Sequence, residues 1–342
     1  MTSDQQHGDD AAQFDALAQD GPQQRAFLRS RWFDASPAPP DRIVLRGEEG
    51  MELAALGLAM RRRGPFRLRE IAGSYWPFRG VPLAQGIDEA VLAAALGRQR
   101  KRLGSIWRLG PVEAGDPELK RLRLALRQAG WHALARPLGQ VFEIDLAALQ
   151  QDGAWPSTKT QRKNRWRKRR LEEEGGAVSV EFFSGSDWTA RQRGALAQIE
   201  AESWLGTLAD GGDTKFRDPE MRRYWEDICT DPVLAAMLFG SLMWIGDTPA
   251  AFTFGIEAGP VRYYIANNYD QRFNQFGAGR VLLYDDFARA GERGVRRISW
   301  GVGDAGYKSE MGAQPGAHLV DLLFVRNALL ARLLSPWWER AA

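Results

Sequence analysis

Two glycine-containing segments near the C-terminal end of the chain combine residue types that suit anion binding and acid–base chemistry. In the first, YYIANNYDQRFNQFGAGRVLLYDDF, an apolar strand pattern leads through Gly277 and Gly279 into a helix pattern. Small residues at such a junction expose backbone N–H groups, and the helix start adds a partial positive charge. The second segment, GVGDAGYKSEMGA, follows a short strand pattern and carries Asp304, Tyr307 and Lys308. Together, the two segments predict a site where an anion binds next to titratable side chains.

A third segment, KTQRKNRWRKRR at residues 159–170, carries eight basic residues and no acidic one. The net charge of the whole chain is only +3, so the basic excess is local. Such a run can read phosphates, contact an anionic membrane, or form the solvated face of a helix that continues into LEEEGG. The sequence leaves these three interpretations open.

The chain contains one cysteine, Cys229, and three scattered histidines. One cysteine cannot form an internal disulfide, and neither zinc-ligand spacing nor a Ser-His-Asp arrangement is present. We therefore expect no metal. The longest uncharged stretch, residues 232–246, is shorter than the ~20 apolar residues of a membrane span, and the acidic start lacks the pattern of a secretion signal. These features predict a cytoplasmic protein.

The hydrophobic periodicity predicts an α/β (α+β) protein with two domains after a disordered leader, residues 1–24. Residues 25–150 alternate strand and helix patterns, and residues 151–342 begin with the basic helix. In the second domain one strand and two helices precede three β-rich runs, which glycine turns join as antiparallel hairpins. The glycine loop, a helix and two further strands follow. In the first domain, the run SYWPFRG is a candidate lining of an acceptor groove.

Three segments together, RKNRWRKRRLEEEGG, the glycine loop with its strand and helix, and GVGDAGYKSEMGA, resemble the GNAT superfamily of acyltransferases. The resemblance is to the subgroup related to the CelD/BcsL proteins of cellulose and exopolysaccharide loci, and more distantly to the Fem peptidyltransferases. It covers about residues 157–326, roughly half of the chain. It implies a tandem GNAT-like fold, with a mixed central sheet flanked by helices and a degenerate first domain.

The resemblance implies that the loop binds the pyrophosphate of acyl-CoA or acetyl-CoA, the expected co-substrate. Asn274 stands where the family's loop usually has Gln or Arg. Asn268 and Tyr269, at the end of the preceding strand, are expected to bind substrate. The loop residues expected to contact the co-substrate are Asn274, Phe276, Gly277, Ala278, Gly279 and Arg280.

Acyl transfer to an amine requires removal of a proton from the ammonium and delivery of one to the leaving thiolate. We expect Asp304 to be the base, with Glu257 as the alternative. The resemblance implies that Tyr307 donates to the thiolate and that Lys308 binds an anionic substrate group. It further implies that N–H groups of the strand AAFTFGIE polarise the thioester carbonyl.

The predicted function is acyl-CoA-dependent N-acyl transfer to an amine, either an amino sugar of a surface polysaccharide or a lipid amine, as in bacterial ceramide synthases. One alternative is a Fem-like transferase that uses aminoacyl-tRNA, with residues 159–170 contacting RNA. Another is a non-catalytic membrane- or nucleic-acid-binding protein on a GNAT scaffold. If the protein is an acyl-CoA-dependent N-acyltransferase, it could contact the anionic inner membrane peripherally. In that case we do not expect nucleic acid as a partner.

Overall fold

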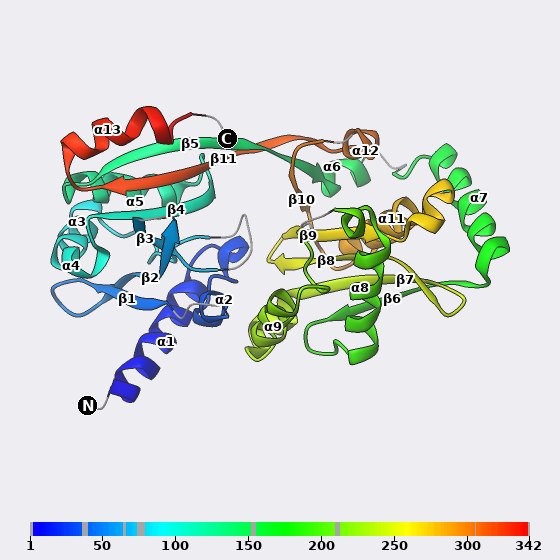
Figure 1. Ribbon diagram of the computed structural model, residues 1–342, viewed down its shortest axis with the longest axis horizontal. Helices are drawn as coiled ribbons and strands as arrows, with labels where there is room; N and C mark the ends of the chain where they lie inside the picture. The colour runs from blue at the N-terminus through cyan, green and yellow to red at the C-terminus, as the bar shows by residue number, and fades with distance from the viewer. Residues whose placement is uncertain are drawn as a thin grey trace. The chain divides into compact units, whose positions relative to one another are not determined.

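A computed structural model describes residues 3–35, 40–63, 66–73, 79–151, 155–208, 213–304 and 306–340. The chain divides into two units, which we describe separately (Figure 1). The first unit comprises residues 1–141 and 315–342, and the second comprises residues 142–314. Strand β5 (His132–Asp145) contributes its first ten residues to the first unit and its end to the second.

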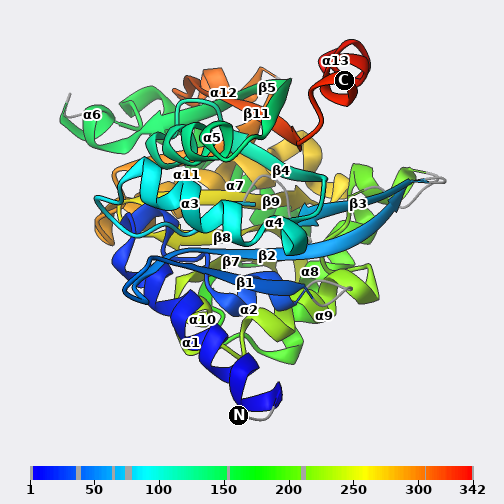
Figure 2. The same cartoon turned by 90° about the vertical axis from the view of Figure 1, so that its left-hand side faces the viewer.

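The first unit contains a mixed sheet whose strands follow the order β1-β2-β3-β4-β11-β5. Most neighbours are antiparallel, whereas β3 and β4 run parallel. In Figure 2, α1 lies along β1 and β2, and α3 packs with α5. Its elements are α1 (Ser3–Asp20), η1 (Gln23–Arg25), α2 (Ser30–Asp34), β1 (Asp41–Arg46), β2 (Glu52–Arg63), β3 (Phe66–Ile71), α3 (Glu89–Arg98), α4 (Arg100–Leu103), β4 (Ile106–Glu113), α5 (Pro117–Gln128), β5, β11 (Gln314–Val325) and α13 (Ala328–Trp338).

The second unit contains the strand order β5-β10-β9-β8-β7-β6. Strands β7, β8 and β9 form antiparallel hairpins, as their glycine turns predict, and β6 pairs antiparallel with β7. Strands β9 and β10 are parallel because α11 connects them. The elements are α6 (Leu146–Gln151), α7 (Thr158–Gly175), β6 (Val178–Ser184), α8 (Ala190–Glu202), η2 (Trp204–Thr207), α9 (Pro219–Ile228), α10 (Pro232–Met237), β7 (Leu238–Ile245), β8 (Thr248–Ala258), β9 (Val261–Tyr269), η3 (Gln271–Phe276), α11 (Ala278–Glu292), β10 (Arg297–Val302) and α12 (Tyr307–Glu310).

Two of our domain boundaries differ from the structure. The expected leader forms α1, which buries Phe14 and Leu17, because its few apolar residues lie one helical turn apart on one face. The C-terminal residues from 315 onward belong to the first unit, where Leu319–Val325 of β11 pairs with β4. Periodicity identifies a strand, but it does not reveal which sheet the strand joins.

The aromatic run expected to line an acceptor groove, residues 74–78, lies outside the described residues. In the part of the chain that the structure describes, no helix is both long and apolar enough to cross a bilayer. The same part contains no cluster of three or more metal-ligating side chains.

Candidate active site

The candidate site begins where β9 and β10 separate. The two strands pair only between Val261–Tyr263 and Arg297–Ser299, at their N-terminal ends. Beyond Tyr263 the C-terminal half of β9 lacks this neighbour in the described structure. Parallel strands that part in this way leave a wedge at their carboxyl ends, where ligands bind in open α/β sheets.

The glycine loop stands at the end of β9. After the short helix η3, Gly277 adopts the left-handed conformation, with φ 65° and ψ 44°, and is the N-cap of α11. Within the described part of the chain no side chain caps this helix, so the first-turn N–H groups of Ala278, Gly279 and Arg280 are available to an anion. A Cβ at Gly279 would lie 2.9 Å from Cδ1 of Tyr269, which means that only glycine fits without displacing the ring.

Two other predicted loop residues contribute backbone rather than side chains. Ala278 is fully buried, and Phe276 packs against the same core, which contains Leu171, Phe273 and Val281. Their side chains therefore anchor the loop.

Two arginines lie beside the loop. Nε of Arg167, from the basic helix α7, would lie 3.2 Å from a Cβ placed on Gly277. Burial and then repulsion by Arg280 lower the pKa of Arg167. Arg280 forms an ion pair with Glu310 at 2.7 Å. An anion placed between these guanidinium groups would relieve their repulsion.

These elements surround a pocket of about 560 Å³. It brings together seven of the predicted residues, and it adds Arg167, Trp204, Asn267, Gln275 and Leu283. The described residues that line it are Arg167, Trp204, Asn267, Asn268, Tyr269, Asn274, Gln275, Gly277, Gly279, Arg280, Leu283 and Tyr307. None of the described lining residues is a carboxylate, and Arg167 and Arg280 are among them, so the pocket is suited to a negatively charged ligand.

Tyr307 is one of two tyrosines that line this pocket, with Tyr269. Its ring packs edge-on against Trp300, with the ring centres 5.3 Å apart. Burial raises the pKa of Tyr307, although a hydrogen bond with the Asn267 side chain lowers it in part. The hydroxyl is therefore protonated at neutral pH and can donate a proton.

The structure gives Asp304 a different role from the expected general base. Its carboxylate accepts hydrogen bonds from the N–H of Gly306 at 2.8 Å, from the N–H of Lys308 at 3.2 Å and from the Ser309 hydroxyl. These bonds, that from Ser309 first, lower the pKa of Asp304. A weakly basic carboxylate held in a turn and absent from the pocket lining is a poor base.

Glu257 also lies outside the pocket lining. Its carboxylate accepts from Nη2 of Arg262 at 2.6 Å and from Nε of Arg293 at 3.1 Å. We therefore assign it no catalytic role. The register of β8 against β9 places Glu257 opposite Arg262, and this pairing was not evident from the sequence.

The strand expected to polarise the thioester carbonyl, residues 250–257, belongs to β8. This strand lies between β7 and β9 and pairs with both. Its N–H groups are therefore engaged in the sheet. The opening faces β9 beyond Tyr263, which makes β9 the better source of such donors.

Lys308 is buried, and its ammonium group donates to three carbonyl oxygens at the end of β10. Nζ lies 2.7 Å from O of Gly303, 3.3 Å from O of Gly301 and 3.4 Å from O of Val302. These bonds close the turn that carries Tyr307. Lys308 is thus a positioning residue, instead of the expected ligand of an anionic substrate.

Burial lowers the pKa of Lys308 to about 8, against a raising effect of Asp304. Between pH 8 and 10.5 the native lysine is neutral while the unfolded lysine still holds its proton, so unfolding takes up a proton and native stability rises with pH. The free energy of unfolding of wild type relative to Lys308→Met should therefore increase across this range, by up to ~3 kcal/mol. Denaturant titrations at pH 7, 8, 9 and 10 measure the difference; a value independent of pH would contradict the buried ammonium.

The chain shares sequence features with one known family and its fold with several solved structures. Residues 159–309 match the family model described as "Acetyltransferase (GNAT) domain". This segment contains the basic helix, the glycine loop and the turn with Tyr307. A comparison with curated protein sequences found no match.

Several solved structures share the fold at low sequence identity. The crystal structure of FemX superposes with a TM-score of 0.65 at 13% identity, covering 95% of this chain and 98% of that chain. The C-terminal domain of a putative lysylphosphatidylglycerol synthetase from Agrobacterium fabrum gives 0.54 at 13% identity, covering 95% and 94%.

A tandem GNAT protein from the clavulanic acid biosynthesis pathway gives a TM-score of 0.52 at 16% identity, covering 94% of this chain and 96% of that chain. The predicted fold class is confirmed: the chain has a mixed sheet flanked by helices in a tandem GNAT fold. Its second unit has a GNAT-type acyltransferase fold. The CelD/BcsL subgroup stays a prediction.

Proposed function

We propose that the protein is an acyl-CoA-dependent N-acyltransferase. The observation that carries the proposal is the uncapped start of α11, flanked by Gly277, Gly279 and Arg167, at the mouth of the wedge between β9 and β10. Close backbone approach and two guanidinium groups fit a pyrophosphate. The acyl thioester would supply an activated carbonyl for attack by an amine.

The side chains of the pocket divide the remaining tasks. Gly279 and the first-turn N–H groups hold the pyrophosphate, with Arg167 and Arg280 at its rim. Tyr307 gives its hydroxyl proton to the thiolate that departs. Among the residues that the structure describes, no carboxylate lines the pocket, and in this proposal water accepts the proton of the attacking amine. The acceptor is an amine-bearing glycan or lipid, and Asn267, Asn268 and Trp204 form the uncharged wall that would face it.

Calorimetric titration with CoA tests the proposal. In Gly279→Leu the new side chain must displace the Tyr269 ring or the ligand, and in Arg167→Gln one rim charge is lost. We expect each variant to bind CoA at least tenfold more weakly, about 1.4 kcal/mol. Arg169→Gln, on the exposed side of α7, is the matched control and should bind as wild type does. Unchanged affinity in folded Gly279→Leu would remove the loop from the site.

A second candidate is transfer from aminoacyl-tRNA, favoured by the exposed cations along α7. Lys163, Arg165, Lys168 and Arg169 are exposed there, and no ion pair involves them in the described structure. A gel shift with charged tRNA at two salt concentrations distinguishes the candidates. Salt-sensitive tRNA binding that Arg165→Gln/Arg169→Gln abolishes, together with absent CoA binding, would favour the second candidate.

A further inference from the structure

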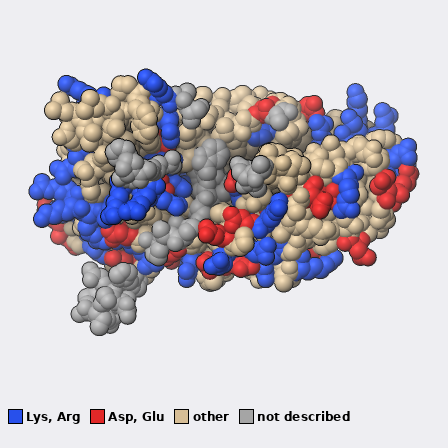
Figure 3. Space-filling view, in the orientation of Figure 1, with Lys and Arg blue, Asp and Glu red and all other residues tan. Residues whose placement is uncertain are grey.

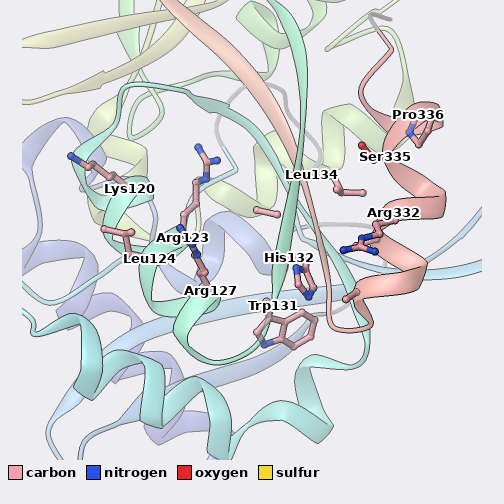
Figure 4. Close-up of a pocket in the computed structure, with 13 residues that line it drawn as sticks. Lys120, Arg123, Leu124, Arg127, Trp131, His132, Leu134, Arg332, Ser335 and Pro336 are labelled. Atoms are coloured by element: carbon pink, nitrogen blue, oxygen red, sulfur yellow. The ribbon is translucent and has the colours of Figure 1, made fainter.

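The first unit contains a second cavity, of about 700 Å³, that the proposed acyl transfer does not use. Figure 4 shows its walls: α5 contributes Lys120, Arg123, Leu124 and Arg127, and α13 contributes Arg332, Ser335 and Pro336. The start of β5 lies between these helices, with Trp131 and His132 at the foot of the cavity.

The lining of this cavity is basic. Lys120, Arg123 and Arg127 recur at intervals of three and four residues and so share one side of α5. Arg332 faces them from α13. No acidic residue lines the cavity, and none of these four cations forms an ion pair within the described residues. Four unpaired cations around one hollow create a positive potential that suits phosphate.

Helix α13 also exposes an apolar stripe. Leu329, Leu333 and Trp337, spaced by four residues, are 69%, 76% and 68% exposed. The opposite side of the helix, with Ala331 and Trp338, packs into the core of the first unit. In Figure 3 the surface over α13 is largely uncharged, and Lys and Arg side chains border it. Folding requires only that one apolar side of a helix be buried, so the exposed apolar stripe of α13 is not needed for the fold.

The stripe and the cavity are adjacent around the helix. At roughly 100° of rotation per residue, Leu329 lies within about 20° of Pro336 and about 60° of Arg332 around the helix axis. The cavity side, the exposed stripe and the core side therefore follow one another around α13. The exposed leucines and tryptophan form one edge of a basic hollow.

We infer that α13 and α5 form a docking surface for an anionic phospholipid bilayer. Leu329, Leu333 and Trp337 enter the interface, where apolar side chains gain burial and tryptophan is favoured. The cations of the cavity bind lipid phosphate, the negative charge that they lack within the protein. The charge complementarity favours a lipid surface over a second copy, whose equivalent surface would carry the same positive charge. This site is distinct from the basic helix α7 and does not depend on the proposed acyl transfer.

Flotation of the full chain with vesicles tests the inference. Vesicles of phosphatidylcholine containing one-third phosphatidylglycerol are compared with vesicles of phosphatidylcholine alone, at low and high salt. We expect binding to the anionic vesicles that weakens with salt. Leu329→Ser/Leu333→Ser and Arg123→Gln/Arg127→Gln should each lower the partition coefficient at least tenfold. Bromine-labelled lipids should quench fluorescence from Trp337, and the quenching should be lost in Trp337→Phe.

The matched control variants remove the same number of exposed apolar or basic side chains from other parts of the first unit. Met51→Ser/Met60→Ser removes two other exposed apolar side chains, and Arg100→Gln/Lys101→Gln removes two exposed charges of the same unit. Both should bind within twofold of wild type. The inference is overturned if wild type does not bind anionic vesicles, or if the controls lose binding equally. It is also overturned if binding is lost only in Arg165→Gln/Arg169→Gln on α7. A wild-type dimer that Leu329→Ser/Leu333→Ser converts to monomer, without vesicle binding, would assign the stripe to a second copy.

Discussion

Tyr307→Phe should lower the turnover number for acyl transfer about a hundredfold, equivalent to ~2.7 kcal/mol of transition-state stabilisation. The variant keeps the ring that packs against Trp300 and loses only the hydroxyl that hydrogen-bonds with Asn267. Affinity for CoA should stay nearly unchanged, because the proton is needed only when the thiolate leaves. Release of free thiol from acetyl-CoA, with glucosamine as the probe acceptor, measures the rate.

Tyr284→Phe is the control for this experiment. Tyr284 lies on α11 near Trp155 and does not line the pocket. Its loss of a hydroxyl should change the turnover number by less than threefold. Full activity of Tyr307→Phe would assign proton delivery to water. A parallel loss of CoA affinity would instead make Tyr307 a binding residue.

Arg262→Met should destabilise the second unit by about 3–5 kcal/mol, because it leaves a buried carboxylate without its cation. Arg262 is 2% exposed, and its Nη1 lies 3.0 Å from Oδ1 of Asp286 on α11. The hydroxyls of Ser241 and Tyr264 donate to the same carboxylate. This network joins β7, the N-terminal end of β9 and the middle of α11. Urea unfolding followed by tryptophan fluorescence measures the loss.

Two further variants distinguish the cost of the unpaired buried charge from a general effect of replacing an arginine. Arg289→Met removes a half-exposed arginine that pairs with Glu292 and should cost within ~0.5 kcal/mol. Arg262→Met/Asp286→Asn removes the stranded charge and keeps an acceptor for the two hydroxyls, so it should recover at least half of the loss. A loss below ~1 kcal/mol in the single variant would show that Asp286 is accommodated without Arg262.

The glycine loop could be predicted from the sequence because its residue types are restrictive. Only glycine tolerates both the left-handed conformation at position 277 and the close ring contact at position 279. The strand and helix patterns on either side then fix the position of the loop in the fold. The prediction that the loop binds an anion depends only on local properties, namely the small residues and the start of a helix.

The other site residues depend on contacts that a local pattern does not contain. Arg167 is one of eight basic residues in a uniform run, and only the rotation of α7 against α11 selects it. Asp304 and a true general base have the same residue type, and the difference lies in Ser309 and two N–H groups. The pairing of Glu257 with Arg262 follows from the register of two strands.

The division of the first unit between the two ends of the chain has a consequence for its synthesis. Strand β11 lies between β4 and β5, and its residues Leu323 and Val325 pack in one core cluster with Trp338 of α13. During synthesis, residues 1–141 therefore cannot complete their sheet until β11 has been translated. Residues 142–314 are contiguous and can fold while that strand is still untranslated. The second unit is thus expected to fold before the first, which reverses the usual order from the N-terminus.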